Sequence, residues 1–184
     1  RRLLMRELEP VSGVVTVNTE LVYLPQDYQF NLKQTIAEAL GVSHILDAIA
    51  KLKGNSQNER LLEVVGAHWD IEARVLKLLE DFGFHGVVLS KKIDELSGGE
   101  RMKVALASLF VFQEQFIVMD EPTNNLDAQS REVLYSYVAN WKHGMLVVSH
   151  DRKLLELVDQ IAEVSPKGVS LYGGNYVYYE TQKQ

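Results

Sequence analysis

Short apolar runs alternate along the chain with longer segments of helical periodicity. Two runs, 116–119 (FIVM) and 144–148 (GMLVV), are continuously apolar, as expected of parallel strands buried on both faces of a sheet. Further strands are predicted over 14–17 and 21–25, with a hairpin over 159–165 and 168–172. Helices are predicted over 35–40, 43–52, 59–65, 70–79 and 130–141, and another begins at residue 97. This order predicts an α/β fold with a mostly parallel core sheet and a helical insertion.

Several residues predict where helices begin and end. Ser43 is a candidate N-cap, and Gly83 is expected to end the helix over 70–79. Trp69, which precedes that helix, is expected to be an N-terminal staple or a core anchor. The first nine residues read as the tail of an amphipathic helix that Pro10 ends.

The helix that begins at residue 97 has an unusual start. Ser97 is a candidate N-cap, and Glu100 is its capping-box partner three residues later. Gly98 and Gly99 leave the backbone amides at this end uncovered. A helix N-terminus with bare amides attracts anions, because its N–H groups and the positive end of its dipole point outward. Alone, the pattern is equally well explained by a well-capped helix without a ligand.

Polar side chains follow three of the predicted strands. Asp120 and Glu121 end the run over 116–119, His150 follows the run over 144–148, and Gln26 follows the strand over 21–25. Open α/β sheets bind ligands at the carboxyl ends of their strands. Asp120 is then placed to hold Mg²⁺ and Glu121 to polarise a water. For an isolated glutamine or histidine after a strand, a solvated surface position is the more common interpretation.

Composition narrows the class of protein further. The 184 residues carry a net charge of −6, which argues against a free-standing nucleic-acid binder. There is no cysteine, so a reducing compartment is natural. His44, His68 and His85 show no ligand spacing and are interpreted as structural. No apolar run approaches the length of a membrane span, and a cytoplasmic location is expected.

Three motifs together carry a resemblance to a known family. They are LSGGE at 96–100, FIVMDEPTNNLD at 116–127 and VVSHD at 147–151. The chain resembles, over nearly its whole length, the P-loop NTPase domain of the ATP-binding cassette (ABC) superfamily. The resemblance implies a core subdomain formed by 1–30 and 97–184 and a helical subdomain formed by 31–96.

The resemblance also implies ATP and Mg²⁺ as cofactors and a role for each motif residue. Glu121 would be the catalytic carboxylate and His150 the switch histidine, whereas Gln26 and Asp120 would hold Mg²⁺. Ser97, Gly98 and Gly99 belong to the signature motif, and Asp127, with Asn125 and Leu126, to the D-loop. Two such domains pair head to tail, so the signature motif serves the ATP that the partner domain holds.

Within the superfamily, three stretches resemble the ABC-F branch. They are EPTNNLD at 121–127, SHDRKLL at 149–155 and YGGNYVYY at 172–179. ABC-F proteins are soluble, carry two ATPase domains on one chain, and often act on the ribosome. The chain resembles the first of the two domains, ending before the linker that usually contacts tRNA and the ribosome.

One family motif is absent from the 184 residues. The phosphate-binding loop G-x-x-x-x-G-K-[ST] (Walker A) has no match in the chain. We therefore expect that the chain starts after this loop, without the N-terminal strands, and hydrolyses ATP only within the full-length protein. Two alternatives stay open: the ATP-binding subunit of a membrane transporter, and a degenerate, non-catalytic domain that donates only its signature motif.

Overall fold

The computed structural model describes residues 5, 7–54, 58–124 and 126–183. They form two compact units, one of residues 1–26 with 114–184 and one of residues 27–113. The expected helical subdomain was 31–96, whereas the contacts also group 27–30 and 97–113 with the helical unit. The division into functional subdomains at residues 30 and 96 stays a prediction, because compactness does not test it.

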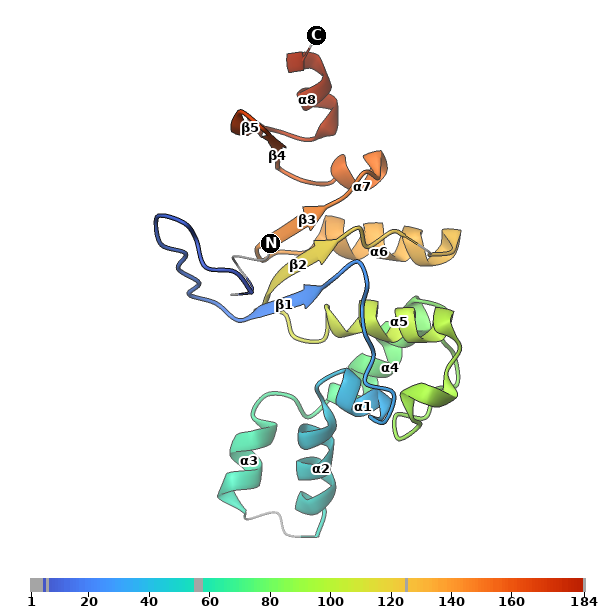
Figure 1. Ribbon diagram of the computed structural model, residues 1–184. Helices are drawn as coiled ribbons and strands as arrows, with labels where there is room; N and C mark the ends of the chain where they lie inside the picture. The colour runs from blue at the N-terminus through green and yellow to red at the C-terminus, as the bar shows by residue number, and fades with distance from the viewer. Residues whose placement is uncertain (1–4, 6, 55–57, 125, 184) are drawn as a thin grey trace. The chain divides into compact units, whose positions relative to one another are not determined.

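The first unit is built on a three-stranded parallel sheet (Figure 1). Its strands are β1 (Leu21–Leu24), β2 (Phe116–Asp120) and β3 (Met145–Val148), in the order β1-β2-β3. Leu24 pairs with Met119, and Met119 pairs with Val147, so the three strands end at the same edge. The sheet confirms the parallel arrangement predicted from the apolar runs.

The rest of this unit follows the sheet strands in the sequence. Helix α6 (Ala128–Asn140) connects β2 to β3, and α7 (Arg152–Leu155) follows β3. The predicted hairpin is formed by β4 (Gln160–Ser165) and β5 (Gly168–Gly173), which pair antiparallel. Helix α8 (Tyr176–Lys183) comes after it.

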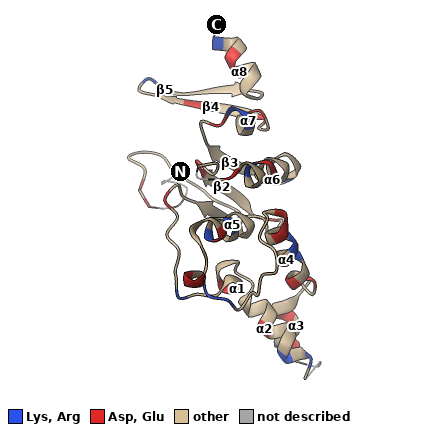
Figure 2. Ribbon diagram, turned by 90° about the vertical axis from the view of Figure 1, so that its right-hand side faces the viewer, with Lys and Arg blue, Asp and Glu red and all other residues tan. Residues whose placement is uncertain are grey.

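The second unit is helical. It contains α1 (Ile36–Ala39), α2 (Ser43–Leu52), α3 (Glu59–Val65), α4 (Ile71–Asp81), the short 3-10 helix η1 (Ile93–Glu95) and α5 (Gly98–Ser108). Its core includes fully buried side chains from α1, α4 and α5, such as Ile36, Leu79 and Leu106. Acidic and basic residues are interspersed along α3, α4 and α5 (Figure 2), which is typical of a solvated surface of mixed charge.

Several local predictions were wrong in whole or in part. Residues 14–17 form no strand, and Val14 is 89% exposed; among the described residues, nothing pairs with this segment to satisfy a strand's hydrogen bonds. Ser43 is the first residue of α2, whose N-cap is Val42. Trp69 is 55% exposed, so of its two expected roles the core anchor is excluded, and the N-terminal staple stays a prediction. Of the expected opening helix, residues 1–4 and 6 lie outside the described residues, and 7–9 are not helical.

Candidate active site

A pocket of about 570 Å³ lies at the carboxyl edge of the three-stranded sheet. It is lined by Gln26, Asp120, Glu121, Asn124, Val148 and His150. Each of the three strands ends at a lining residue or within two residues of one, since β1 ends at Leu24, β2 at Asp120 and β3 at Val148. The structure thus brings together, within one unit, the four side chains that the sequence placed at the ends of three strands.

Glu121 and His150 face each other across this pocket. The His150 Nε2 atom lies 3.4 Å from Glu121 Oε1, and the His150 backbone amide donates to Glu121 Oε2 at 3.3 Å. The Glu121 side chain is 12% exposed, whereas that of His150 is 98% exposed. The carboxylate is therefore a largely sheltered acceptor, and the imidazole projects into open space where a ligand can meet it.

Glu121 has an unusual backbone. Its φ is +50°, a positive value that no other non-glycine residue in the described part of the chain adopts. Two hydrogen bonds hold it there: its N–H donates to the Val148 carbonyl at 2.7 Å, and its carbonyl accepts from the Asn124 N–H at 3.1 Å. Left-handed backbone costs on the order of 1 kcal/mol or more for such a residue and is concentrated at functional sites. The conformation turns the chain sharply just after β2.

The donor set at the strand ends fits a magnesium ion. Asp120 is 4% exposed and Gln26 is exposed, and both line the pocket. Mg²⁺ is usually held by one or two carboxylates together with waters and phosphate oxygens, rather than by a cage of protein ligands. No cluster of three or more His, Cys, Asp or Glu that could hold a metal occurs among the described residues. One carboxylate and one amide oxygen match an ion held mainly by its nucleotide.

Asp127 has a structural role that the sequence reading did not anticipate. It is the N-cap of α6: its Oδ1 accepts from the Ser130 amide at 2.7 Å, and its Oδ2 accepts from the Ser130 hydroxyl at 3.1 Å. The expected role of Asp127 in binding nucleotide stays a prediction. Asn125, named with it in the D-loop, lies outside the described residues.

The predicted capping box at α5 is confirmed in the helical unit. The Glu100 amide donates to Ser97 Oγ at 3.3 Å, and the Ser97 amide donates to Glu100 Oε2 at 2.8 Å. The Ser97 hydroxyl also donates to Glu100 Oε2 at 2.7 Å, and this hydrogen bond, with that of the backbone, lowers the pKa of Glu100. A Cβ added at Gly98 or Gly99 would meet nothing within 4 Å, so the helix start is open on the side of both glycines.

A hydrogen-bonded pair behind His150 was not found from the sequence. The Tyr135 hydroxyl donates to Asp151 Oδ2 at 2.5 Å, and Asp151 Oδ1 accepts from the Leu154 amide at 3.2 Å. Burial opposes ionisation of Asp151, but the hydrogen bonds from Tyr135 and Leu154 outweigh it and lower the pKa. Burial, followed by the bond to Asp151, raises the pKa of Tyr135 to about 12. In the sequence, the position of Asp151 directly after His150 was the indication that Asp151 lies close to the candidate site.

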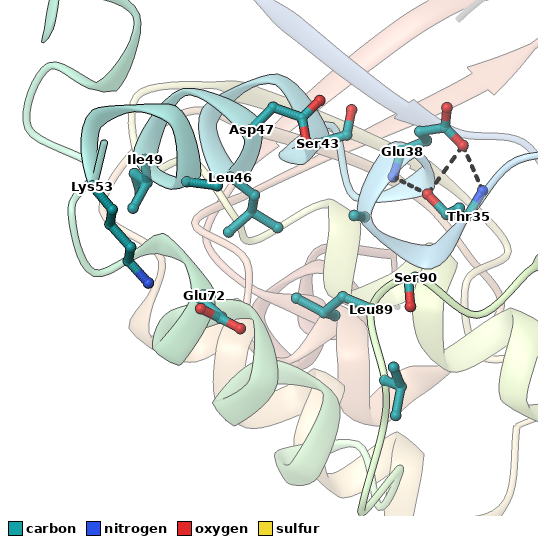
Figure 3. A pocket seen from close by; sticks show the side chains of 13 residues that line it. Thr35, Glu38, Ser43, Leu46, Asp47, Ile49, Lys53, Glu72, Leu89 and Ser90 are labelled. Atoms are coloured by element: carbon teal, nitrogen blue, oxygen red, sulfur yellow. Dashed lines mark hydrogen bonds between the residues drawn. The ribbon is translucent and has the colours of Figure 1, made fainter. Parts of the chain in front are cut away.

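The helical unit contains a second pocket, of about 590 Å³ (Figure 3). Leu46, Ile49 and Leu89 supply apolar lining, while Glu38, Asp47, Lys53 and Glu72 add charged groups around it. The Thr35 side chain at one end belongs to the capping box of α1, in which the Glu38 amide donates to Thr35 Oγ1 at 3.2 Å. This pocket contains none of the residues predicted for nucleotide chemistry.

Comparison with known proteins identifies the family. Residues 2–124 match the family model described as ABC transporter. The tylosin resistance ATP-binding protein TlrC of Streptomyces fradiae is 30% identical over 206 residues, which cover 99% of this chain and 38% of that protein. ABC transporter F family member 4 of Arabidopsis thaliana is 30% identical over 177 residues, covering 95% of this chain and 24% of that protein. The chain belongs to the ABC transporter family, and its relatives include members of the F branch.

Solved structures show the same fold at lower identity. A structure titled "Structure of ATP binding subunit of ABC transporter" has a TM-score of 0.64 at 20% identity, over 88% of this chain and 66% of that one. A chain in the complex of archaeal ribosomal stalk protein aP1 with the ribosome recycling factor aABCE1 has a TM-score of 0.60 at 22% identity, over 92% of this chain and 30% of that one. These likenesses confirm the α/β fold of ABC ATPases.

Two facts limit what the family assignment says about this chain. The chain spans 38% of the tylosin resistance protein and 24% of the Arabidopsis protein, so it corresponds to one part of proteins of that length. Among the described residues, no helix combines the length and apolar character that crossing a membrane requires.

Proposed function

We propose that this chain is an ATP-binding and ATP-hydrolysing domain of an ABC-F protein, the first of two that pair head to tail. The observation that carries the proposal is the meeting of Glu121 and His150, 3.4 Å apart, in a pocket that Asp120 and Gln26 also line. These residues come from separate parts of the sequence, and the parallel sheet brings their side chains close together.

Each residue has a chemical part in the proposed hydrolysis. Glu121 accepts a proton from the attacking water, and its sheltered carboxylate is well placed to do so. His150 extends an exposed imidazole that donates to the γ-phosphate. Asp120 and Gln26 would hold Mg²⁺, which would neutralise charge that develops on the phosphates. Ser97, Gly98 and Gly99 present bare amides to the ATP held by the partner domain.

The expected setting is cytoplasmic, with the ribosome and tRNA as partners through a linker outside this chain. The similarity to the tylosin resistance ATP-binding protein TlrC and to ABC transporter F family member 4 supports this branch over a membrane transporter. A second candidate is a non-catalytic domain that donates only its signature motif. That role would need only the open start of α5 at Gly98 and Gly99.

Replacing Glu121 tests the catalytic proposal. In the complete protein, Glu121→Gln keeps the shape of the side chain and removes the base, so ATP turnover is expected to fall about 10²–10⁴-fold at retained ATP binding. Glu114→Gln, at an exposed position before β2, is the matched control and should leave turnover unchanged. Turnover by Glu121→Gln equal to that of the unmodified protein would refute the assignment and favour the non-catalytic domain.

The partner is tested with the same variant. Hydrolysis ends the ATP-bound, closed state of γ-phosphate switches, so Glu121→Gln should accumulate in that state. We expect it to sediment with ribosomes when ATP is present and to be released when ATP is omitted. Retention by membrane vesicles, with no ribosome binding, would support a transporter subunit instead.

A further inference from the structure

The exposed imidazole of His150 needs something other than packing to hold it. Its side chain is 98% exposed, so few neighbours restrict it, yet its Nε2 atom lies 3.4 Å from Glu121. The restraint must therefore come through the backbone on either side of the residue. On one side is β3, which ends at Val148, and on the other is Asp151.

Asp151 fixes the backbone at the second of these points. Its Oδ1 accepts from the Leu154 amide at 3.2 Å, which caps α7, and its own amide donates to the Ser149 hydroxyl at 3.0 Å. Its Oδ2 accepts from the Tyr135 hydroxyl at 2.5 Å. The residues immediately before and after His150 are thus joined to each other and to a distant helix.

Tyr135 is a rigid anchor for this arrangement. It lies on α6, is 8% exposed, and is flanked by the buried Leu134 and Val138 of the same helix. The Lys153 ammonium lies 4.9 Å from the centre of its ring and also contacts Glu132 at 2.7 Å. A buried ring of this kind has few alternative rotamers, so its hydroxyl presents a fixed donor.

The same carboxylate also reaches the loop that carries the proposed base. The Thr123 side chain, which is buried, lies near Asp151 and contributes to the lowered pKa of its carboxyl group. Thr123 lies in the turn that follows Glu121, closed by the hydrogen bond from the Asn124 amide to the Glu121 carbonyl. Asp151 is therefore bonded beside His150 and lies near the turn that follows Glu121.

We propose that Tyr135 and Asp151 form a positioning pair that holds His150 in register with Glu121 and so sets the rate of ATP hydrolysis. Neither residue touches the reacting atoms: Tyr135 acts through Asp151, and Asp151 acts through the backbone of His150. The inference rests on the proposed function of the pocket. A shift of about 1 Å in a catalytic group can lower a rate by about 100-fold, so a buried hydrogen bond behind the site is sufficient to matter.

The test removes one oxygen atom. In the complete protein, Tyr135→Phe keeps the buried ring and deletes the hydroxyl, and we expect kcat to fall about 10–100-fold with KM for ATP within about twofold. Tyr172→Phe is the matched control, because it deletes a hydroxyl that donates to Glu163 at 3.4 Å in the hairpin. That control should keep its kcat.

A second variant separates positioning from general loss of structure. Asp151→Asn keeps a good helix cap but weakens the acceptor for Tyr135. If the two residues act as one unit, the double variant should lose no more kcat than about the worse single variant. Independent, multiplicative losses, an unchanged kcat in Tyr135→Phe, or an equal loss in Tyr172→Phe would each overturn the pair.

The outcome also distinguishes this inference from the function on which it rests. If Glu121→Gln abolishes turnover while Tyr135→Phe does not affect it, the pocket hydrolyses ATP and the positioning pair is refuted. If Glu121→Gln leaves turnover unchanged, the catalytic assignment itself fails, and the inference fails with it.

Discussion

At the scale of single residues, the chain uses charged side chains to complete hydrogen bonds at the ends of its elements. Glu100 receives both the hydroxyl and the amide of Ser97, and the resulting fall in its pKa means that the folded state favours the carboxylate. A lowered folded pKa contributes stability above the ordinary value of 4.5, and this contribution is lost as the pH falls through the folded value.

Ser97→Ala tests this capping box. The substitution removes the acceptor of the Glu100 amide and one donor to its carboxylate, and should destabilise the start of α5 by about 1 kcal/mol at pH 7. Hydrogen exchange of the α5 amides measures the effect. The difference from the unmodified protein should shrink as the pH falls below 4.5, because protonated Glu100 is a poorer acceptor. Ser97→Thr, which keeps the oxygen, should restore protection; equal protection in Ser97→Ala would contradict the role of the box.

At the scale of elements, a helix or strand could be predicted from the sequence when residues close to one another in the chain determine it. The strands β2 and β3 follow from continuous apolar runs, and α5 follows from its capping box, because each cause lies within a few residues. The segment 14–17 has the composition of a strand but no pairing partner among the described residues. The bond between Tyr135 and Asp151 joins positions 16 apart through a packed helix, which no local pattern reports.

A close approach between β2 and the start of β3 gives a test at this scale. A Cβ added to Gly144 would lie 2.3 Å from the Phe116 ring, and the Gly144 carbonyl accepts from the Ile117 amide at 3.1 Å. Gly144→Ala should therefore destabilise the sheet by about 1–3 kcal/mol, measured as a lower midpoint of denaturation of the complete protein. Gly173→Ala is the control, since its Cβ would meet nothing within 4 Å. Equal midpoints for both variants would show that Phe116 moves aside at no cost.

At the scale of the whole molecule, the candidate chemistry is divided between the two compact units. The pocket of Glu121 and His150 belongs to the unit formed by 1–26 and 114–184, whereas Ser97 and its glycines belong to the unit 27–113. The sequence placed each motif on its element, because the strand and cap signals are local. It could not reveal the left-handed backbone of Glu121, since that conformation depends on a hydrogen bond to Val148 from a strand far along the chain.

We expect that a substitution in the signature motif can lower ATP turnover without destabilising either compact unit. Gly99 has open space where a side chain would grow and no positive φ, so Gly99→Asp should change the free energy of unfolding by no more than about 0.5 kcal/mol. If Gly99 faces the γ-phosphate of the partner domain's ATP, the added carboxylate repels it, and turnover of the complete protein should fall about tenfold or more. Gly99→Ala adds bulk without charge and should lose less. If Gly99→Asp hydrolyses ATP at the unmodified rate with its fold intact, this helix start does not meet a nucleotide, and α5 is capped for stability alone.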